Sequence, residues 1–252
     1  MKLSELLNLI SETADKKGLS KPFICGGIPR DKLLGDLKNI DDLDITTGDE
    51  SIHYLAKELS FYFKDKNSYY KILDDGHAQI MIGSFKLDFS SNYRAPEIKN
   101  ILIKNGIKNP TNMQMELYSR DFTCNTLLLS LDLKKISDPI GKGVKDINNK
   151  ILKTCLPTEI TLSNNHKRIV RIIYLACKLN FDVDKEIIEW VKKNPSLISD
   201  DSKKGYLIKK LKSAFNYNPQ KTIKLLDEMN LWNYIPIIEE FIPYMSRKSL
   251  RI

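Results

Sequence analysis

The sequence lacks any apolar run long enough to cross a membrane, and it is poor in histidine and cysteine. No stretch approaches the roughly 18 consecutive apolar residues of a spanning helix, so we expect no membrane span. The 3 histidines and 4 cysteines, with no CxxC spacing, argue against a zinc site and indicate reduced thiols in a cytoplasmic protein. The first residues carry acids within their apolar stretch and no small-residue cleavage site, so they predict a helix rather than a signal peptide.

Basic residues exceed acidic ones, and the excess is confined to one half of the chain. The sequence has 40 Lys and Arg against 32 Asp and Glu, a net charge of +8. Residues 1–140 hold 19 basic and 20 acidic side chains, whereas residues 141–252 hold 21 basic and 12 acidic ones. The second half either faces a polyanion or carries a solvated basic surface, and charge alone does not decide between the two.

The apolar pattern divides the chain into a mixed α+β region and a helical region. Up to residue 138 we expect a helix over residues 4–17, further helices at "DKLLGDL" and "SIHYLAKELSFYF", and strands at "PFICGG", "DDLDITT", "YYKIL", "HAQIMIG" and "SFKLDFSS". Beyond it, "HKRIVRIIYLACKL", "KEIIEWVKK", "GYLIKKLKSAF", "QKTIKLLDEMN" and "NYIPIIEEFIPYM" have helical spacing. We therefore predict an α+β fold with a mixed-sheet domain at 1–138 and an all-helical domain at 139–252.

Three acids, Asp41, Asp42 and Asp44, lie close together in the second predicted strand. Side chains alternate faces along a strand, so Asp42 and Asp44 project together while Asp41 points away. Asp88, in the alternating run "FKLDFSS", could bring a third carboxylate from a neighbouring strand. Neighbouring carboxylates are costly unless a cation lies between them. Three on one sheet face suit two Mg²⁺ ions, which activate the attacking hydroxyl in phosphoryl or nucleotidyl transfer.

The turn before these acids has residues suited to phosphate. Gly26 and Gly27 have no side chains, so phosphate oxygens can approach their backbone N–H groups. Arg30 adds a positive charge beside them. Glycine pairs also occur in ordinary turns, and paired acids also occur on ordinary surfaces. Their order here, with the turn first and the acidic strand second, suits a triphosphate followed by its metal ions.

Four ordered motifs resemble those of one enzyme family. "GGIPRDKLLG" and "DDLDITT" resemble the GG-x-V-R-D-x-L-L-G and D-x-D-x-x-T signature of class II tRNA nucleotidyltransferases and bacterial poly(A) polymerases. These belong to the DNA polymerase beta-like nucleotidyltransferase superfamily. "SRDFTCNTL", "DPIGKGVKDINNKILKT" and "NNHKRIVRIIYLACKLNF" are similar to three further family motifs. The match runs from residue 24 to about 181, and it implies a nucleotidyltransferase head followed by a helical neck and a short body.

The resemblance implies roles for the matched residues of the head. Asp42 and Asp44 would bind Mg²⁺, with Asp88 as the third carboxylate. The triphosphate would be held by three residues of the glycine turn and the following helix: Gly26, Gly27 and Arg30. The ribose and the incoming nucleotide would be positioned by three residues of the "SRDFTCNTL" motif: Arg120, Asp121 and Asn125.

In the helical half, the resemblance implies that Arg168 reads the base edge and that Arg171, on the same helix face, reaches the phosphates. Asn164 and Asn165 stand where the family pattern has Glu-Asp, and Ser119 and Pro29 also depart from it. The Asn165 carbonyl oxygen can still accept from the amine of C or A, but its NH₂ can also donate to the carbonyls of U or G. A looser base preference, or a preference for A alone, is therefore an alternative to strict C and A selection.

These expectations combine into one function. We expect a Mg²⁺-dependent enzyme that adds nucleotides to an RNA 3′ end without a template, with tRNA as acceptor, CCA-type addition, and ATP and CTP as substrates. A poly(A) polymerase on generic RNA ends and a non-catalytic RNA-binding relative are the alternatives. The basic helical half would contact the RNA backbone in a sequence-independent and salt-sensitive way.

Overall fold

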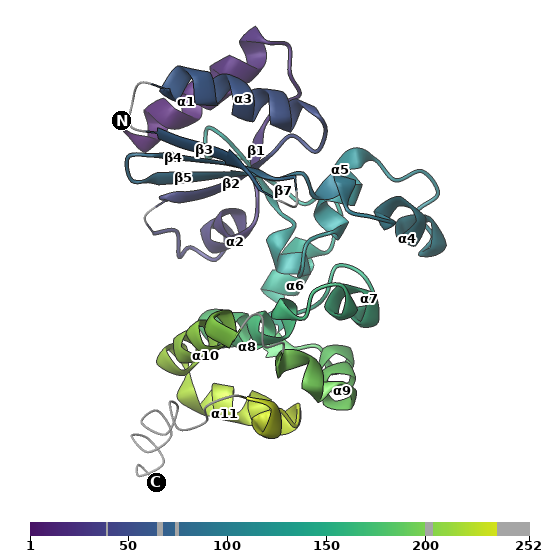
Figure 1. The fold of residues 1–252 in the computed structure, drawn as a ribbon. Coiled ribbons are helices and arrows are strands. Elements are labelled where there is room, and N and C mark those ends of the chain that lie inside the picture. The colour runs from purple at the N-terminus through teal and green to yellow at the C-terminus, as the bar shows by residue number, and fades with distance from the viewer. Residues whose placement is uncertain (39, 65–67, 74–75, 200–203, 236–252) are drawn as a thin grey trace. The chain divides into compact units, whose positions relative to one another are not determined.

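The computed structural model describes residues 1–252 except 39, 65–67, 74–75, 200–203 and 236–252 (Figure 1). The chain forms two compact units, Met1–Lys145 and Asp146–Ile252, a few residues beyond the expected domain boundary at 138. Most of the helix expected at "NYIPIIEEFIPYM" lies outside the described residues. At its start, the structure has a short 3-10 helix at Trp232–Tyr234. Within the described ranges, no helix is both long and apolar enough to span a membrane.

A 7-stranded mixed sheet forms the centre of the first unit, with strand order β3-β4-β5-β2-β1-β6-β7. Its strands are β1 (Phe23–Ile24), β2 (Asp42–Thr46), β3 (Ser68–Ile72), β4 (Ala78–Ile82), β5 (Phe85–Phe89), β6 (Leu128–Ser130) and β7 (Ile136–Ser137). Strands β2 and β5 pair in parallel, and all other pairs in this sheet are antiparallel. The predicted mixed sheet is confirmed, including the hairpin of β4 and β5.

Helices α1 (Leu3–Lys16) and α3 (Ser51–Phe63) cover one face of this sheet (Figure 1). The apolar face of α1 is buried in the shared core, together with Leu43 and Ile45 of β2 and Leu87 of β5. Because side chains alternate along a strand, the intervening residues of β2 and β5 point to the opposite face. The packing of these helices thus decides which face of the sheet carries the acids.

Helix α2 (Gly27–Leu33) begins before the predicted start at Asp31. Gly26 precedes it with φ of 75°, a conformation that glycine adopts without steric cost. Pro29 is tolerated in the first turn because its missing N–H would have no helical partner there. The helix therefore starts directly at the glycine pair.

Two short helices follow the sheet strands in a segment for which we predicted no element. They are α4 (Ile98–Lys104) and α5 (Asn112–Tyr118). The Thr111 side chain accepts a hydrogen bond from the Gln114 backbone N–H, and the Gln114 side-chain oxygen accepts one from the Thr111 backbone N–H. This capping box is a signal for a helix start that the sequence already contained.

The second unit is helical as predicted, apart from two paired strands of two residues each. Its helices are α7 (Thr158–Ser163), α8 (Lys167–Leu179), α9 (Lys185–Lys193), α10 (Lys204–Tyr217) and α11 (Pro219–Glu228), and α6 (Gly143–Asn148) crosses the division between the units. Strands β8 (Ile151–Leu152) and β9 (Asp182–Val183) run parallel. Helix α8 packs against α10 and α11, so the unit is built around α8.

Candidate active site

The three predicted acidic residues lie on neighbouring parallel strands, on the sheet face opposite α1 and α3. The register of β2 and β5 places Asp44 beside Asp88, and Asp42 beside Lys86. Residues two apart share a face, so all four side chains project to the same side. The structure therefore brings the predicted carboxylates together and adds a lysine that the sequence analysis did not identify.

Lys86 forms ion pairs with two of these carboxylates. Its Nζ lies 3.1 Å from Asp42 Oδ1 and also pairs with Asp88 Oδ2. Burial alone would lower the pKa of the Lys86 ammonium, but the hydrogen bonds to Asp88 and Asp42 raise this pKa on balance. Gln79 Nε2 donates to the other oxygen of Asp88 over 2.7 Å. Lys86 is thus the counter-ion of the acidic cluster in this structure.

The carboxylate of Asp44 is buried among other charged groups. Burial raises the pKa of Asp44, and the negative charges of Asp88 and Asp42 raise it further, while Arg120 and Lys86 oppose this shift. Ionised Asp44 is therefore unfavourable unless more positive charge lies nearby. A divalent cation would supply that charge.

The donor set fits a hard cation in its chemistry, because Mg²⁺ prefers carboxylate oxygens. Across the part of the chain that the structure describes, however, no three His, Cys, Asp or Glu side chains are arranged to hold one ion together. The strand register supplies the donors, and Lys86 occupies the place between Asp42 and Asp88. Ion binding at these residues therefore requires a rearrangement of side chains rather than of strands.

The glycine turn lies directly against Asp44. A Cβ atom on Gly26 would overlap Asp44 Oδ2, and the φ of 75° also disfavours any other residue there. The backbone N–H of Cys25 donates to the Asp44 carbonyl over 2.9 Å. Gly26 is thus required both for the turn and for the close approach of the acidic strand.

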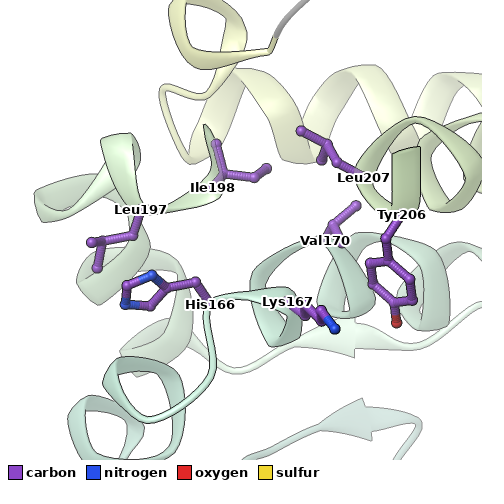
Figure 2. Close-up of a pocket in the computed structure, with 7 residues that line it drawn as sticks. All are labelled: His166, Lys167, Val170, Leu197, Ile198, Tyr206 and Leu207. Carbon is purple, nitrogen blue, oxygen red and sulfur yellow. The ribbon is translucent and has the colours of Figure 1, made fainter. Parts of the chain in front are cut away.

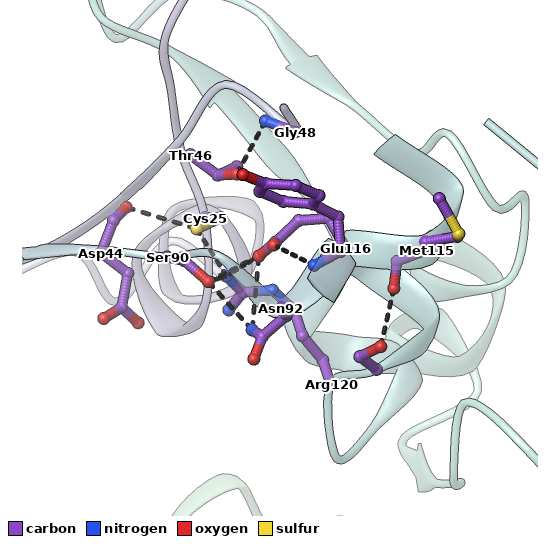
Figure 3. Close-up of polar contacts among 11 residues, drawn as sticks. Cys25, Asp44, Thr46, Gly48, Ser90, Asn92, Met115, Glu116 and Arg120 are labelled. Atoms are coloured by element: carbon purple, nitrogen blue, oxygen red, sulfur yellow. Dashed lines mark hydrogen bonds and ion pairs between the residues drawn. The ribbon is translucent and has the colours of Figure 1, made fainter. Parts of the chain in front are cut away.

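Arg120 lies beside Asp44 with most of its side chain shielded from solvent (Figure 3). Its Nη2 donates to Glu116 Oε1 over 3.1 Å, to Ser90 Oγ over 3.2 Å and to Cys25 Sγ over 2.8 Å. The side chain of Arg120 is 10% exposed and that of Glu116 is 0% exposed. The positive charge of Arg120 therefore opposes the rise in the pKa of Asp44, and the Arg120 side chain is largely shielded from solvent.

Glu116 is the centre of this buried network (Figure 3). It accepts hydrogen bonds from Ser90 Oγ over 2.6 Å and from the backbone N–H of Tyr93 over 3.0 Å, in addition to the bond from Arg120. Burial would lower the pKa of Arg120, but the negative groups around it, Glu116 and Asp44 among them, raise this pKa on balance. The network joins α5 to Ser90 and Tyr93, which follow β5, the strand that carries Asp88.

Three further residues predicted to bind nucleotide form a second buried chain of hydrogen bonds. Arg30 Nη1 donates to Asn125 Oδ1, and Asn125 Nδ2 donates to Asp121 Oδ1 over 2.9 Å. Arg30 Nε also donates to Asp31 over 2.7 Å, and the Arg30 residue is only 3% exposed. A Cβ on Gly27 would meet the Arg30 guanidinium at 3.1 Å. The Arg30 guanidinium thus lies against the glycine turn, and Asn125 links it to Asp121.

The predicted residues of the helical half lie at and near the N-terminus of α8, in the second unit. The side-chain oxygen of the exposed Asn165 accepts from the backbone N–H of Lys167 over 3.1 Å. Arg168 Nη1 donates to the Thr161 carbonyl over 3.1 Å, and Arg171 is half-buried. A pocket beside them is lined by His166, Lys167, Val170, Leu197, Ile198, Tyr206 and Leu207 (Figure 2).

Helices α8 and α10 pack together, and neither contains an acidic residue. The Lys210 ammonium lies 4.2 Å from the Tyr174 ring centroid and 5.7 Å from that of Tyr206. Burial lowers the pKa of Lys210, and the cations Arg171, Lys209 and Lys178 lower it further. This helix pair thus carries several positive side chains, one of which packs against two tyrosine rings.

Sequence analysis did not identify Lys86, Glu116, Cys25 and Ser90 as parts of the site. For Lys86 a signal existed, because it lies two residues before Asp88 in an alternating strand and so shares its face. Glu116 had no such signal, because a single acid in an α-helix is typical of a solvated surface. Only the packing of α5 shows that Glu116 is buried.

Comparison with known proteins identifies the family. Residues 22–153 match the poly(A) polymerase head domain. The A-adding tRNA nucleotidyltransferase of Aquifex aeolicus is 26% identical over 234 residues, which cover 88% of this chain and 26% of that protein. The CCA-adding enzyme of Staphylococcus aureus strain MRSA252 is 24% identical over 239 residues, which cover 94% of this chain and 56% of that enzyme.

A solved structure shows the same fold. A tRNA nucleotidyltransferase complexed with a primer tRNA and an incoming ATP analogue superposes with a TM-score of 0.61 at 25% identity. The similarity covers 92% of this chain and 62% of that one. This chain thus spans between about a quarter and three fifths of the relatives named here. Because the head-domain match covers more than half of its residues, the chain belongs to the poly(A) polymerase head domain family.

Proposed function

We propose that this chain catalyses template-independent addition of nucleotides to the 3′ end of tRNA, of the CCA type. One observation carries the proposal: Asp42, Asp44 and Asp88 share one sheet face, and the turn at Gly26 lies against Asp44. The names of the relatives, which include A-adding and CCA-adding enzymes, support tRNA as the acceptor. The RNA 3′-hydroxyl would attack the α-phosphate of ATP or CTP, and pyrophosphate would leave.

In this mechanism, Asp42, Asp44 and Asp88 would hold Mg²⁺. When bound, Mg²⁺ supplies a Lewis acid that favours deprotonation of the attacking hydroxyl and stabilises charge on the phosphate oxygens. The backbone at Gly26 and Gly27 would approach the triphosphate. Arg30 would hold the triphosphate together with this turn. Arg120, Asp121 and Asn125 would position the ribose and the incoming nucleotide, and Arg120 would also provide positive charge beside Asp44.

The two regions predicted from the sequence would have separate roles. We assign the chemical step to the head, residues 1–138, and base and RNA binding to the helical region, residues 139–252. Arg168 and Asn165 would contact the incoming base, and Arg171 would contact phosphate. Arg171 belongs to the acid-free helix α8, which supports this assignment.

The decisive experiment is an incorporation assay with tRNA transcripts that end before CCA, after C and after CC. Each nucleoside triphosphate is offered separately with Mg²⁺, beside an unstructured RNA. Ordered addition of C, C and A confined to tRNA is the expected result. Long A tails on either RNA would instead identify a poly(A) polymerase, and RNA binding without incorporation would identify a non-catalytic relative.

Asn165→Asp is expected to sharpen the preference for C and A over U and G. The side-chain NH₂ of Asn165 can donate to the carbonyls of U or G, whereas a carboxylate only accepts. The discrimination should increase by about tenfold, the scale of one hydrogen bond gained or lost. The measurement is kcat/KM for each triphosphate on a tRNA transcript. An unchanged ratio would show that Asn165 does not face the base.

Lys210→Ala is expected to weaken RNA binding and to make it less sensitive to salt. Each phosphate contact that is lost lowers the slope of log affinity against log salt by roughly 0.7 to 0.9. The matched control is Lys224→Ala on α11, because Lys224 already pairs with Glu228 at 3.6 Å. Salt titrations of tRNA binding would compare both variants with the unmodified chain. Equal salt-dependence slopes for the two variants would show that the positive charge of α8 and α10 is an ordinary solvated surface that does not contact RNA.

A further inference from the structure

We propose that Lys86 is a tethered counter-ion that occupies the cation position between Asp42 and Asp88 and is displaced when a divalent ion binds. The proposal rests on the metal site within the function proposed above, not on turnover, and assigns a positioning role to a residue outside the four sequence motifs. Lys86 makes the only ion pairs that the described structure shows for Asp42 and Asp88.

The strand register determines on which face of the sheet the Lys86 side chain lies. Across the parallel pair of β2 and β5, Lys86 lies directly beside Asp42, and along β5 it precedes Asp88 by two residues. Both relations place its side chain on the acidic face. Leu87 is buried in the opposite core, so β5 cannot turn Lys86 away without exposing its apolar side.

Lys86 and a divalent ion would compete for the same oxygens. Asp88 Oδ2 accepts from Lys86, and Asp88 Oδ1 accepts from Gln79 over 2.7 Å. Each of these oxygens keeps a second lone pair, so a divalent ion at Asp88 competes with Lys86 chiefly through charge. An ammonium and a divalent cation that contact the same carboxylate also repel each other.

Lys86 is the donor that can leave. Its side chain is 34% exposed, and four rotatable bonds allow the ammonium to move into solvent while the strand stays in place. Before the ion arrives, Lys86 neutralises part of the acidic cluster; afterwards, the ion takes over this role. The consequence is a lower intrinsic affinity for divalent ions than the carboxylates alone would have.

The first test measures divalent-ion binding to the full chain by calorimetry, with Mn²⁺ and without nucleotide. Lys86→Met is expected to bind Mn²⁺ about tenfold more tightly, the scale expected when two partly exposed ion pairs no longer have to be broken. Lys86→Arg keeps the charge and should not tighten binding. Lys17→Met is the control, because it removes a surface ion pair with Glu58 in the same unit. Equal affinities for Lys86→Met and Lys17→Met would overturn the proposal.

The second test uses the unmodified chain and so does not depend on the folding of a variant. Acylation of individual lysines by an amine-reactive reagent is measured by mass spectrometry with and without Mg²⁺. Release from the two carboxylates should increase the labelling of Lys86 several-fold, while Lys17 serves as an internal reference. Unchanged labelling of Lys86 at saturating Mg²⁺ would overturn the proposal. Neither measurement requires turnover, so failure of nucleotide incorporation would refute the proposed function and leave this inference standing.

Discussion

Asp44→Ala is expected to lower nucleotide incorporation by about 10²- to 10³-fold, the scale for removal of one preorganised electrostatic group. Asp44 lies at the meeting point of the glycine turn, the acidic face and the buried Arg120. Without its carboxylate, the site would lose the ligand nearest to the turn. Single-turnover incorporation of ATP and CTP into tRNA, beside tRNA binding by the same variant, would measure the effect.

The control for this experiment is Asp36→Ala in the same unit. Asp36 is exposed and pairs with Lys38 at 3.3 Å, so its removal should leave incorporation unchanged. Asp44→Ala should also remain folded. Because the pKa of Asp44 is raised in the folded state, its ionised form lowers stability above the ordinary pKa of an aspartate, and removing the charge relieves that cost at neutral pH. Substantial incorporation by a folded Asp44→Ala variant would refute the site assignment.

Arg120→Met is expected to lower the free energy of unfolding by about 3–5 kcal/mol, the scale for breaking a buried ion pair from one side. The change leaves Glu116 fully buried without its ion-pair partner and removes hydrogen bonds to Ser90 and Cys25. Since domains are stable by only about 5–15 kcal/mol, a loss of this size is severe. Urea denaturation monitored by circular dichroism would measure it.

The structure offers a matched control with the same residue types. Arg94 and Glu50 also form an Arg–Glu pair in the first unit, but their side chains are 51% and 57% exposed. Arg94→Met should therefore cost less than about 1 kcal/mol, because solvent screens exposed ion pairs. Equal losses for Arg94→Met and Arg120→Met would show that burial of the Glu116 network contributes nothing to stability.

Periodicity in the sequence was sufficient to predict the regular elements that bury one apolar face. Helical spacing of Leu6, Leu7, Ile10 and Ala14 predicts one apolar face for the helix expected over residues 4–17, and all four are buried in α1. Helices α3 and α8 also lie where helical spacing indicates. Strand alternation also placed Asp42 and Asp44 on one face, because the period of two holds for any strand that packs on one side. Such patterns are local, and each can be recognised within a single segment of the chain.

Two short helices were missed for a related reason. Helices α4 and α5 have seven residues each, which is too short for a clear period of 3.6. The start of α2 at Gly27 was also misplaced, because the glycine pair and Pro29 read as a turn rather than as the first turn of a helix. In these segments, capping and turn chemistry determine the boundary, and the apolar pattern carries little information.

By itself, the sequence determined the order of the motifs, the types of residue in the site and the faces of the individual strands. Only the tertiary structure decided which strands are neighbours and in what register, and so placed Lys86 between Asp42 and Asp88. It also decided that Arg120 and Glu116 are buried. The physical reason is that strand pairing and burial depend on contacts between segments far apart in the chain, whereas periodicity describes one segment at a time.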